Sequence, residues 1–354
     1  MKCTTGKYLP VSVVIPTYNR AGLIRRAVDS VLVSVEDEDE VIVVDDGSSD
    51  NTEEVLFPYR NRIRYIRTGN AGAGAARNRG VREARNPLVA FLDSDDEWMP
   101  HKLQVQRAVM QARPDVLFCF SDFAVRYLTG ETVRRYLINW HSDTRSWTEI
   151  LGPAIPFSLL SPLPCGGDNF PVHIGNMYLQ EMKANYISTI TLMARRTEAG
   201  DALRFSEDTD IYEDWECIGR LAGAGKAAYL DCETAWNHGH RGKRLTDADT
   251  LRCTGARIRM LERLWGTNTE FLSRHGELYR EVLAAQYLLH AKELIVRGMT
   301  PEARRDLRCI GEVPFPYLFL ASLPGPLAQW LYAVRKETKS LIARVRTEKG
   351  GKGK

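Results

Sequence analysis

The chain has 354 residues, of which 44% are hydrophobic and 26% charged, enough for one large α/β domain or two smaller ones with sizeable cores. A net charge of +3 is too small to indicate nucleic-acid binding. The seven cysteines form no Cys-x-x-Cys pair, which argues against a zinc knuckle or a disulfide framework and favours a reducing, cytoplasmic setting. No segment reaches the roughly 20 apolar residues of a membrane-spanning helix, and we expect no signal peptide at the N-terminus.

Strand and helix signals alternate over the first third of the chain. Short, apolar, β-branched runs predict buried strands at 11–15, 41–44, 63–66, 88–92 and 116–120. Helical spacing of apolar residues predicts helices at 23–32, 52–57, 74–84 and 100–112. This alternation predicts a mostly parallel sheet with helices on both faces.

The rest of the chain is less regular. Residues 127–186 have poor periodicity and many prolines, glycines and aromatic residues, so we interpret them as an insertion beside the active site. Order returns at 188–193, and a helix at 213–224 and a strand at 227–230 follow. After about residue 250 the pattern is helical throughout.

Three polar clusters follow predicted strands directly: residues 16–20, 45–50 and 93–96. Ligands of parallel sheets bind at the carboxyl ends of the strands. The topology and the chemistry therefore point to the same edge of the sheet.

Asp93 and Asp95 supply two carboxylates at the end of the fourth strand. A hard divalent cation held by one or two carboxylates can neutralise a diphosphate while keeping phosphate oxygens as its other ligands. The alternative is an acidic turn that caps the residues after it, because Asp and Ser are good caps. The cluster alone does not decide between the two.

The other clusters suit a nucleotide. An aspartate at the end of the second strand, Asp45 or Asp46, can accept the ring N–H of uracil or guanine, although a capped turn explains the pair equally well. Residues 16–20 offer backbone groups and the Tyr18 ring to a base, or form a strand-to-helix turn capped by Asn19. Arg77 follows a glycine-rich loop that lacks both the dinucleotide-binding and the P-loop pattern, and it could face a phosphate.

Two further segments carry candidate residues. Residues 213–216 have two interpretations. They are an acidic first helical turn that the helix dipole favours, or they include a general base that takes a proton from an acceptor hydroxyl. His238 and His240 lie in a loop rich in glycine and arginine, where they are metal ligands or incidental.

Five motifs in this order resemble the family 2 glycosyltransferases, inverting enzymes with the GT-A fold. The motifs are Val-Ser-Val-Val-Ile-Pro-Thr-Tyr-Asn-Arg (11–20), Val-Val-Asp-Asp-Gly-Ser-Ser-Asp (43–50), Ala-Arg-Asn-Arg-Gly (76–80), Phe-Leu-Asp-Ser-Asp-Asp (91–96) and Glu-Asp-Trp-Glu (213–216). Each motif alone is weak, whereas five in order are specific. The match covers roughly residues 9–245, and the 127–186 insertion has no clear counterpart in the common pattern.

The resemblance implies a role for each matching residue. It implies that Asp214 is the catalytic base of a single, inverting displacement, and that residues 187–193 form the strand before the acceptor site. The implied cofactor is Mn²⁺ or Mg²⁺, with Asp95 the direct ligand, Asp93 its partner, and His240 favoured over His238 to complete the site. The residues implied to bind the donor are Pro16, Tyr18, Asp45, Asp46, Arg77, Asp93 and Asp95.

We therefore expect a GT-A (Rossmann-like) nucleotide-sugar-binding domain at 1–245, a helical region at 246–334 and a basic, disordered tail at 335–354. The expected donor is a nucleoside-diphosphate sugar, most simply a UDP-sugar, and the acceptor is a hydroxyl of a glycan or lipid-linked glycan in bacterial polysaccharide or glycolipid synthesis. Residues 316–334 are apolar with aromatic residues, and the tail after them has eight basic and two acidic residues. That pairing suits attachment to the inner face of the membrane, or a core segment followed by a disordered tail.

Two other function classes compete with this interpretation. A nucleotidyltransferase also uses a metal and paired carboxylates, but it would carry a glycine-rich, basic signature after the first strand, where this chain has Pro-Thr-Tyr-Asn-Arg. A non-catalytic scaffold that binds nucleotide sugars would not need both Asp95 and Asp214.

Overall fold

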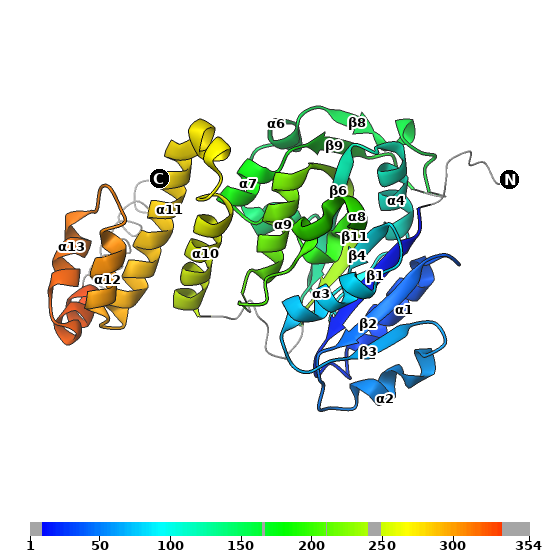
Figure 1. Cartoon of the computed structure of the whole chain (residues 1–354), viewed down its shortest axis with the longest axis horizontal. Helices are drawn as coiled ribbons and strands as arrows, with labels where there is room; N and C mark the ends of the chain where they lie inside the picture. The colour runs from blue at the N-terminus through cyan, green and yellow to red at the C-terminus, as the bar shows by residue number, and fades with distance from the viewer. Residues whose placement is uncertain (1–8, 165–166, 210, 240–248, 335–354) are drawn as a thin grey trace, which may run out of the picture. The chain divides into compact units, whose positions relative to one another are not determined.

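The computed structural model describes residues 9–164, 167–209, 211–239 and 249–334, and the chain divides into two compact units, 1–243 and 244–354 (Figure 1). The first unit begins with strands and helices in alternation, as the sequence predicts. Its elements up to residue 126 are β1 (Val11–Thr17), α1 (Ile24–Ser34), β2 (Glu40–Asp45), α2 (Thr52–Leu56), the 3₁₀ turn η1 (Phe57–Tyr59), β3 (Arg64–Arg67), α3 (Ala73–Glu83), β4 (Leu88–Phe91), β5 (Glu97–Trp98), α4 (Lys102–Ala112) and β6 (Val116–Arg126).

Residues 127–186, whose sequence has poor periodicity, form a series of short elements in the structure. They contain β7 (Thr132–Val133), α5 (Leu137–His141), α6 (Trp147–Leu151), β8 (Ala154–Pro156), η2 (Phe157–Leu159), β9 (Pro171–Gly175) and α7 (Tyr178–Lys183). These elements are two to six residues long. Elements this short do not produce a hydrophobic periodicity that can be recognised in the sequence.

The first unit ends with the elements that the sequence analysis treated as a return to order. They are η3 (Thr189–Thr191), β10 (Met193–Arg195), α8 (Arg196–Ala199), η4 (Gly200–Leu203), α9 (Glu213–Ala224) and β11 (Lys226–His238). The strand expected at 187–193 is wrong, because Thr189–Thr191 form a 3₁₀ turn and the strand begins only at Met193. The β-branched run favoured a strand, but burial rather than pairing accounts for its apolar residues.

Within the described residues, one sheet contains all the strands in the order β3-β2-β1-β4-β10-β6-β11-β9-β8, with β5 on β11 and β7 on β6. Strands β3, β2, β1 and β4 are parallel neighbours, and so are β6 and β11. Strand β10 runs antiparallel between β4 and β6. The predicted parallel sheet is therefore present, with an antiparallel strand at its centre and antiparallel strands beyond β11.

Helices cover both faces of the sheet. Ile42 and Val44 of β2 pack with Ala76 of α3, whereas Val41 and Val43 join the main core on the other face. This division follows from the alternation of side chains along a strand. On β1, Val14 faces α3, and Gly80 permits the contact because a Cβ there would lie 2.3 Å from a Val14 methyl carbon.

The second unit is helical where it is described. It comprises α10 (Thr250–Leu264), α11 (Thr269–Val296), α12 (Thr300–Leu307) and α13 (Phe315–Ser322), and residues 325–334 are helical as well. Its core gathers apolar residues of α11, α12, α13 and the last helix around Ile295, Ala303 and Ala321. None of the described helices is long and apolar enough to cross a membrane.

Candidate active site

The carboxyl ends of the first parallel strands lie level at one edge of the sheet. Thr17 at the end of β1 pairs with Asp45 of β2, which pairs with Arg67 of β3. Leu92, just after β4, donates its N–H to the Val14 carbonyl. The three polar clusters that follow β1, β2 and β4 therefore meet at this edge, as predicted.

Asp46 holds the glycine-rich loop between β3 and α3. One carboxylate oxygen accepts the N–H of Ala71 at 2.9 Å and the other that of Gly72 at 2.7 Å, and the Thr68 hydroxyl lies 3.3 Å from the first. The residue is 3% exposed. A carboxylate has about four acceptor positions, so these contacts leave room for a further donor such as a base N–H.

Asp45, beside it, is turned into the protein. Its side chain accepts the Ser48 N–H at 2.7 Å and the Tyr65 hydroxyl at 2.6 Å, and the residue is fully buried. Burial together with the hydrogen bond to Asp45 raises the pKa of Tyr65 well above its usual range. Asp45 thus shapes the turn on which Asp46 sits.

The turn after β1 is tied to the turn after β2. The Asn19 side chain, on a backbone with φ of +52°, accepts the N–H of Ser49 at 2.7 Å, and the Asn19 N–H donates to the Ser48 hydroxyl at 2.9 Å. Asn tolerates this left-handed conformation better than most residues. Pro16 is buried beneath the turn and Tyr18 stands exposed on it, so its ring is available to a ligand.

Arg77 links the aspartate cluster to the acidic turn of α9. Its guanidinium is buried and donates to Asp93 at 2.7 Å and to Glu213 at 2.8 Å (both N–O distances). Burial alone would lower the pKa of Arg77, but Asp93, Glu213 and Asp214 outweigh it and raise that pKa. Arg77 does not present its charged end to solvent, so any effect of Arg77 on a diphosphate passes through these carboxylates.

The three aspartates after β4 differ in their surroundings. Asp93 and Asp95 have side chains 32% and 21% exposed, and an Arg20 guanidinium nitrogen lies 3.6 Å from an Asp95 oxygen. Asp96 is buried and accepts the His238 N–H at 2.9 Å and the Asn237 amide at 3.1 Å. Asp96 therefore fixes the end of β11 to the aspartate segment.

The pKa values of Asp93 and Asp96 are raised first by burial and then by neighbouring carboxylates. Burial raises the pKa of Asp93, and the negative charge of Asp95 adds to this rise, although the positive charge of Arg77 opposes it. Burial also raises the pKa of Asp96, with Asp95 and Asp93 contributing. A cation bound between Asp93 and Asp95 would relieve this repulsion.

The described residues contain no group of three or more His, Cys, Asp or Glu side chains placed to hold a metal ion. From the described residues a cation would have two carboxylates, Asp93 and Asp95, and a bound nucleotide could supply further oxygen ligands, which suits Mg²⁺ or Mn²⁺. His238 is buried, with its ring Nε2 2.9 Å from Glu97. His240, which the resemblance favours as a ligand, lies outside the described residues.

Asp214 stands at the start of α9, one residue beyond Glu213. The carboxylate accepts the Thr189 hydroxyl at 3.0 Å and the Trp215 N–H at 2.7 Å, and the residue is half-buried. It is oriented by two donors and still open on one side. Glu213 is instead buried against Arg77, and burial, with Asp214 next, raises its pKa to about 7.

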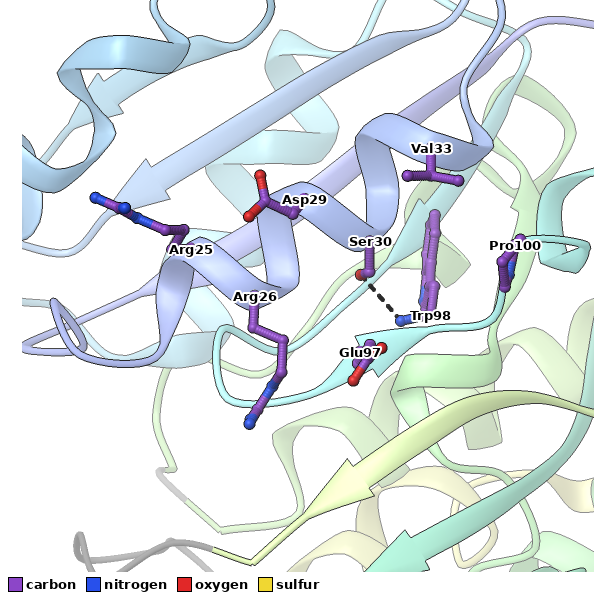
Figure 2. A pocket seen from close by; sticks show the side chains of 8 residues that line it. All are labelled: Arg25, Arg26, Asp29, Ser30, Val33, Glu97, Trp98 and Pro100. Carbon is purple, nitrogen blue, oxygen red and sulfur yellow. Dashed lines mark hydrogen bonds between the residues drawn. The ribbon is translucent and has the colours of Figure 1, made fainter.

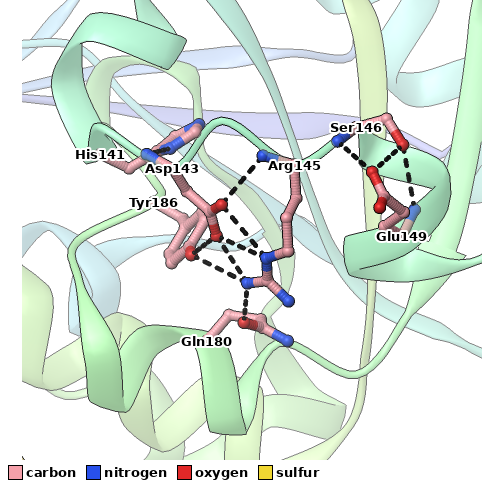
Figure 3. Close-up of polar contacts among 7 residues, drawn as sticks. All are labelled: His141, Asp143, Arg145, Ser146, Glu149, Gln180 and Tyr186. Carbon is pink, nitrogen blue, oxygen red and sulfur yellow. Dashed lines mark hydrogen bonds and ion pairs between the residues drawn. The ribbon is translucent and has the colours of Figure 1, made fainter.

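A polar network in the 127–186 segment joins Asp143, Arg145, Gln180 and Tyr186 (Figure 3). Asp143 binds the Arg145 guanidinium and the Tyr186 hydroxyl, and Arg145 also donates to Gln180 at 2.8 Å. Hydrogen bonding to Arg145 holds the pKa of Asp143 below its usual range. The α7 residue Glu181 then accepts from the Trp215 indole N–H through its carbonyl, at 3.0 Å, so this network is joined to α9.

A pocket of about 510 Å³ lies between α1 and β5 (Figure 2). Val33, Trp98 and Pro100 form its apolar part, and Arg25, Arg26, Asp29, Ser30 and Glu97 complete its wall. The backbone N–H of Trp98 donates to the Ser30 hydroxyl at 3.0 Å. None of these residues is a predicted site residue. Arg26 nevertheless donates a hydrogen bond to the Asp95 carbonyl and so helps to fix the backbone of the aspartate segment.

Sequence reasoning missed the partners of the site residues rather than the residues themselves. The local sequence carries no signal for three of these contacts: the ion pair of Arg77 with Glu213, the hydrogen bond of Thr189 to Asp214, and the pairing of β5 with β11. These contacts join residues 25 to 139 positions apart. The burial of Glu213, but not its pairing with Arg77, could have been predicted from the amphipathic pattern of the helix.

Comparisons with known proteins point to glycosyltransferases. Residues 12–170 match the family model described as Glycosyl transferase family 2. An uncharacterized glycosyltransferase of Nostoc sp. is 42% identical over 100 residues, which are 27% of this chain and 31% of that protein. The uncharacterized glycosyltransferase YibD of Escherichia coli K12 is 36% identical over 126 residues, 34% of this chain and 36% of that protein. The chain thus spans about a third of the length of these relatives.

Solved structures of TarS from S. aureus resemble the fold. TarS 1–349 superimposes with a TM-score of 0.54 at 18% identity, covering 86% of this chain and 81% of that one. The same protein in complex with UDP-GlcNAc gives a TM-score of 0.53 at 16% identity, covering 84% and 88%. The expected GT-A α/β architecture, with its largely parallel sheet followed by C-terminal helices, is confirmed.

Proposed function

Because residues 12–170 of this chain match the model of glycosyl transferase family 2, we propose that the chain transfers a sugar from a UDP-sugar to a hydroxyl acceptor with inversion at the anomeric carbon. One observation carries the proposal. Arg77 bridges Asp93 and Glu213, so the carboxylates after β4 and the start of α9 are held together at the edge where β1 and β2 also end.

The donor would lie across the ends of β1, β2 and β4. Asp46 would accept the ring N–H of uracil, while Tyr18 offers its ring and Pro16 supports the turn from below. Asp45 contributes through the turn that it holds with Ser48 and Tyr65. The binding of UDP-GlcNAc by TarS, a protein of the same fold, supports a uridine nucleotide.

Asp214 would act as the general base. Its Thr189 and Trp215 contacts fix the carboxylate, and its open side can take the proton of an acceptor hydroxyl as that oxygen forms the new bond to the sugar. The bond from the sugar to the nucleoside diphosphate breaks in the same step, and the diphosphate leaves with the electron pair. Attack from the side opposite the leaving group inverts the anomeric centre.

Asp93 and Asp95 would hold Mn²⁺ or Mg²⁺, with Asp95 as the direct ligand. Such a cation stabilises the negative charge of the departing diphosphate. The two carboxylates are partly exposed and repel each other, which is the setting that a cation stabilises. His240 remains the proposed third protein ligand.

The acceptor would be a glycan or a lipid-linked glycan, reached while the second unit lies on an anionic membrane surface. In α13 the exposed residues Phe315, Leu318 and Phe319 share one helical face, and Leu327 and Trp330 share a face of the next helix. The sequence beyond residue 334 has eight basic and two acidic residues. Exposed aromatic residues next to basic ones suit the headgroup region of anionic lipid.

The test of this function is a donor screen. The protein is incubated with UDP-, GDP- and dTDP-sugars in the presence of Mn²⁺, and the released nucleotide is identified. We expect UDP from a UDP-sugar. Formation of UTP and sugar 1-phosphate when pyrophosphate is supplied with the UDP-sugar would instead indicate a nucleotidyltransferase. Binding of a donor without any turnover would indicate a non-catalytic scaffold.

A further inference from the structure

Helix α9, which carries Asp214, begins without the usual local support. Its N-cap residue Tyr212 has a left-handed backbone (φ +64°, ψ +20°) and makes no side-chain capping bond. A bulky residue in this conformation is strained, and it persists only where surrounding contacts impose it. The position of Asp214 must therefore be fixed from outside the helix.

Helix α3 supplies contacts to the segment that leads into α9. The Asn78 side-chain amide donates to the Phe205 carbonyl and accepts the Phe205 N–H, both at 2.8 Å. Gly74 lets the backbone come close, because a Cβ there would lie 2.3 Å from the Ser206 carbonyl oxygen. A side-chain amide that matches both groups of one backbone residue fixes that residue in two directions.

Arg77, also on α3, holds the first residue of α9 itself. Its guanidinium is 5% exposed, binds Glu213 at 2.8 Å and Asp93 at 2.7 Å, and lies over the Phe205 ring at 5.3 Å from its centroid. A buried charge of this kind cannot move away from either carboxylate without being left uncompensated. Arg77 therefore sets the distance between the donor-side Asp93 and the start of α9.

We infer that α3 is the platform that positions the catalytic base, with Arg77, Asn78 and Glu213 as positioning residues for Asp214. The inference rests on the proposed function of Asp214. It also assigns Arg77 a role other than direct contact with the donor diphosphate.

The test compares two equivalent substitutions in one helix. Glu213→Gln removes the charge that Arg77 binds, whereas Glu216→Gln removes a buried charge that pairs at 2.6 Å with Arg220. Misplacement of a base by about 1 Å can cost on the order of 100-fold. We expect Glu213→Gln to lower kcat by roughly 10- to 100-fold with the Kd for UDP within about twofold of wild type, and Glu216→Gln to change kcat little.

Hydrogen exchange over residues 203–216 gives a readout that needs no turnover. We expect faster exchange there in Glu213→Gln, and in Asn78→Ala, than in Glu216→Gln. Equal kcat values and equal exchange in Glu213→Gln and Glu216→Gln would overturn the inference, as would a parallel loss of UDP affinity and kcat in Glu213→Gln. If the wild type turns over no donor, the proposed function fails, and the exchange data still decide whether α3 positions α9.

Discussion

Substituting Asp46 by Asn tests the proposed base-binding residue. Asn has the same shape, but only one of its two terminal atoms can accept a hydrogen bond. Asp46 now accepts two backbone N–H groups, from Ala71 and Gly72, at 2.9 and 2.7 Å. Asp46→Asn therefore leaves one of them facing an NH₂ group.

The expected cost follows from these contacts. A hydrogen bond to a charged acceptor contributes about 1.5–3 kcal/mol and a neutral one about 0.5–1.5 kcal/mol. Ala71 is exposed, so water replaces part of the loss. We expect a loss of about 1–2 kcal/mol in unfolding free energy, and a fall of about 2–8 °C in Tm for a unit of this size.

Nucleotide binding should suffer separately. An uncharged amide accepts a uracil N–H less well than a carboxylate does, and roughly 1.4–3 kcal/mol corresponds to a 10- to 100-fold higher Kd for UDP. The assay is isothermal titration calorimetry with UDP, beside thermal unfolding. Asp45→Asn is the matched control, because Asp45 also accepts two donors but is fully buried.

The control variant should lose stability and keep most of its UDP affinity. Unchanged UDP affinity in Asp46→Asn, despite a lower Tm, would mean that Asp46 only ties the loop. An equal loss of affinity in both variants would mean that the shape of the turn, and not a contact with the base, controls binding.

Chelation with EDTA should abolish transfer by the wild type, and added Mn²⁺ should restore it. In Asp95→Asn, added Mn²⁺ should restore little activity. Full activity of the wild type after exhaustive chelation would show that transfer needs no metal. Burial lowers the pKa of Lys102 to about 7, below its value of about 10.4 in an unfolded chain. Between about pH 7 and pH 10 the unfolded state therefore binds more protons than the folded state, so the free energy of unfolding should rise with pH over this range. Urea unfolding of Lys102→Met should lack this rise. Gly80→Ala should cost about 1–3 kcal/mol because its Cβ would overlap Val14, whereas Gly69→Ala, with nothing within 4 Å, should stay within about 0.5 kcal/mol.

The parallel strands, and the edge of the sheet where they end, were predictable from sequence. Apolar runs such as 41–44 match β2 closely, and the polar residues after them, Asp46 among them, stand where strand ends meet. The helix at Glu213–Ala224 was predicted with its bounds because its amphipathic pattern is strong. Local pattern sufficed wherever an element was long or its burial regular.

What could not be predicted depends on contacts between distant segments. Strand β5 has two residues and exists because Trp98 and Glu97 pair with Ala235 and Trp236. The 187–193 run has the composition of a strand, yet it forms a turn whose Thr189 reaches Asp214. The orientation of Arg77 toward Glu213, 136 positions away, likewise has no trace in the local sequence.

The central claim is that Asp214 is the base of a nucleotide-sugar transfer, and Asp214→Asn tests it most directly. Donor binding is measured by calorimetry and transfer by release of UDP in the presence of acceptor. A general base contributes roughly 10²- to 10⁴-fold to the rate, so the account predicts a loss of that order in kcat with an almost unchanged Kd for the donor. Retained turnover, or a collapse of donor binding together with kcat, would contradict it.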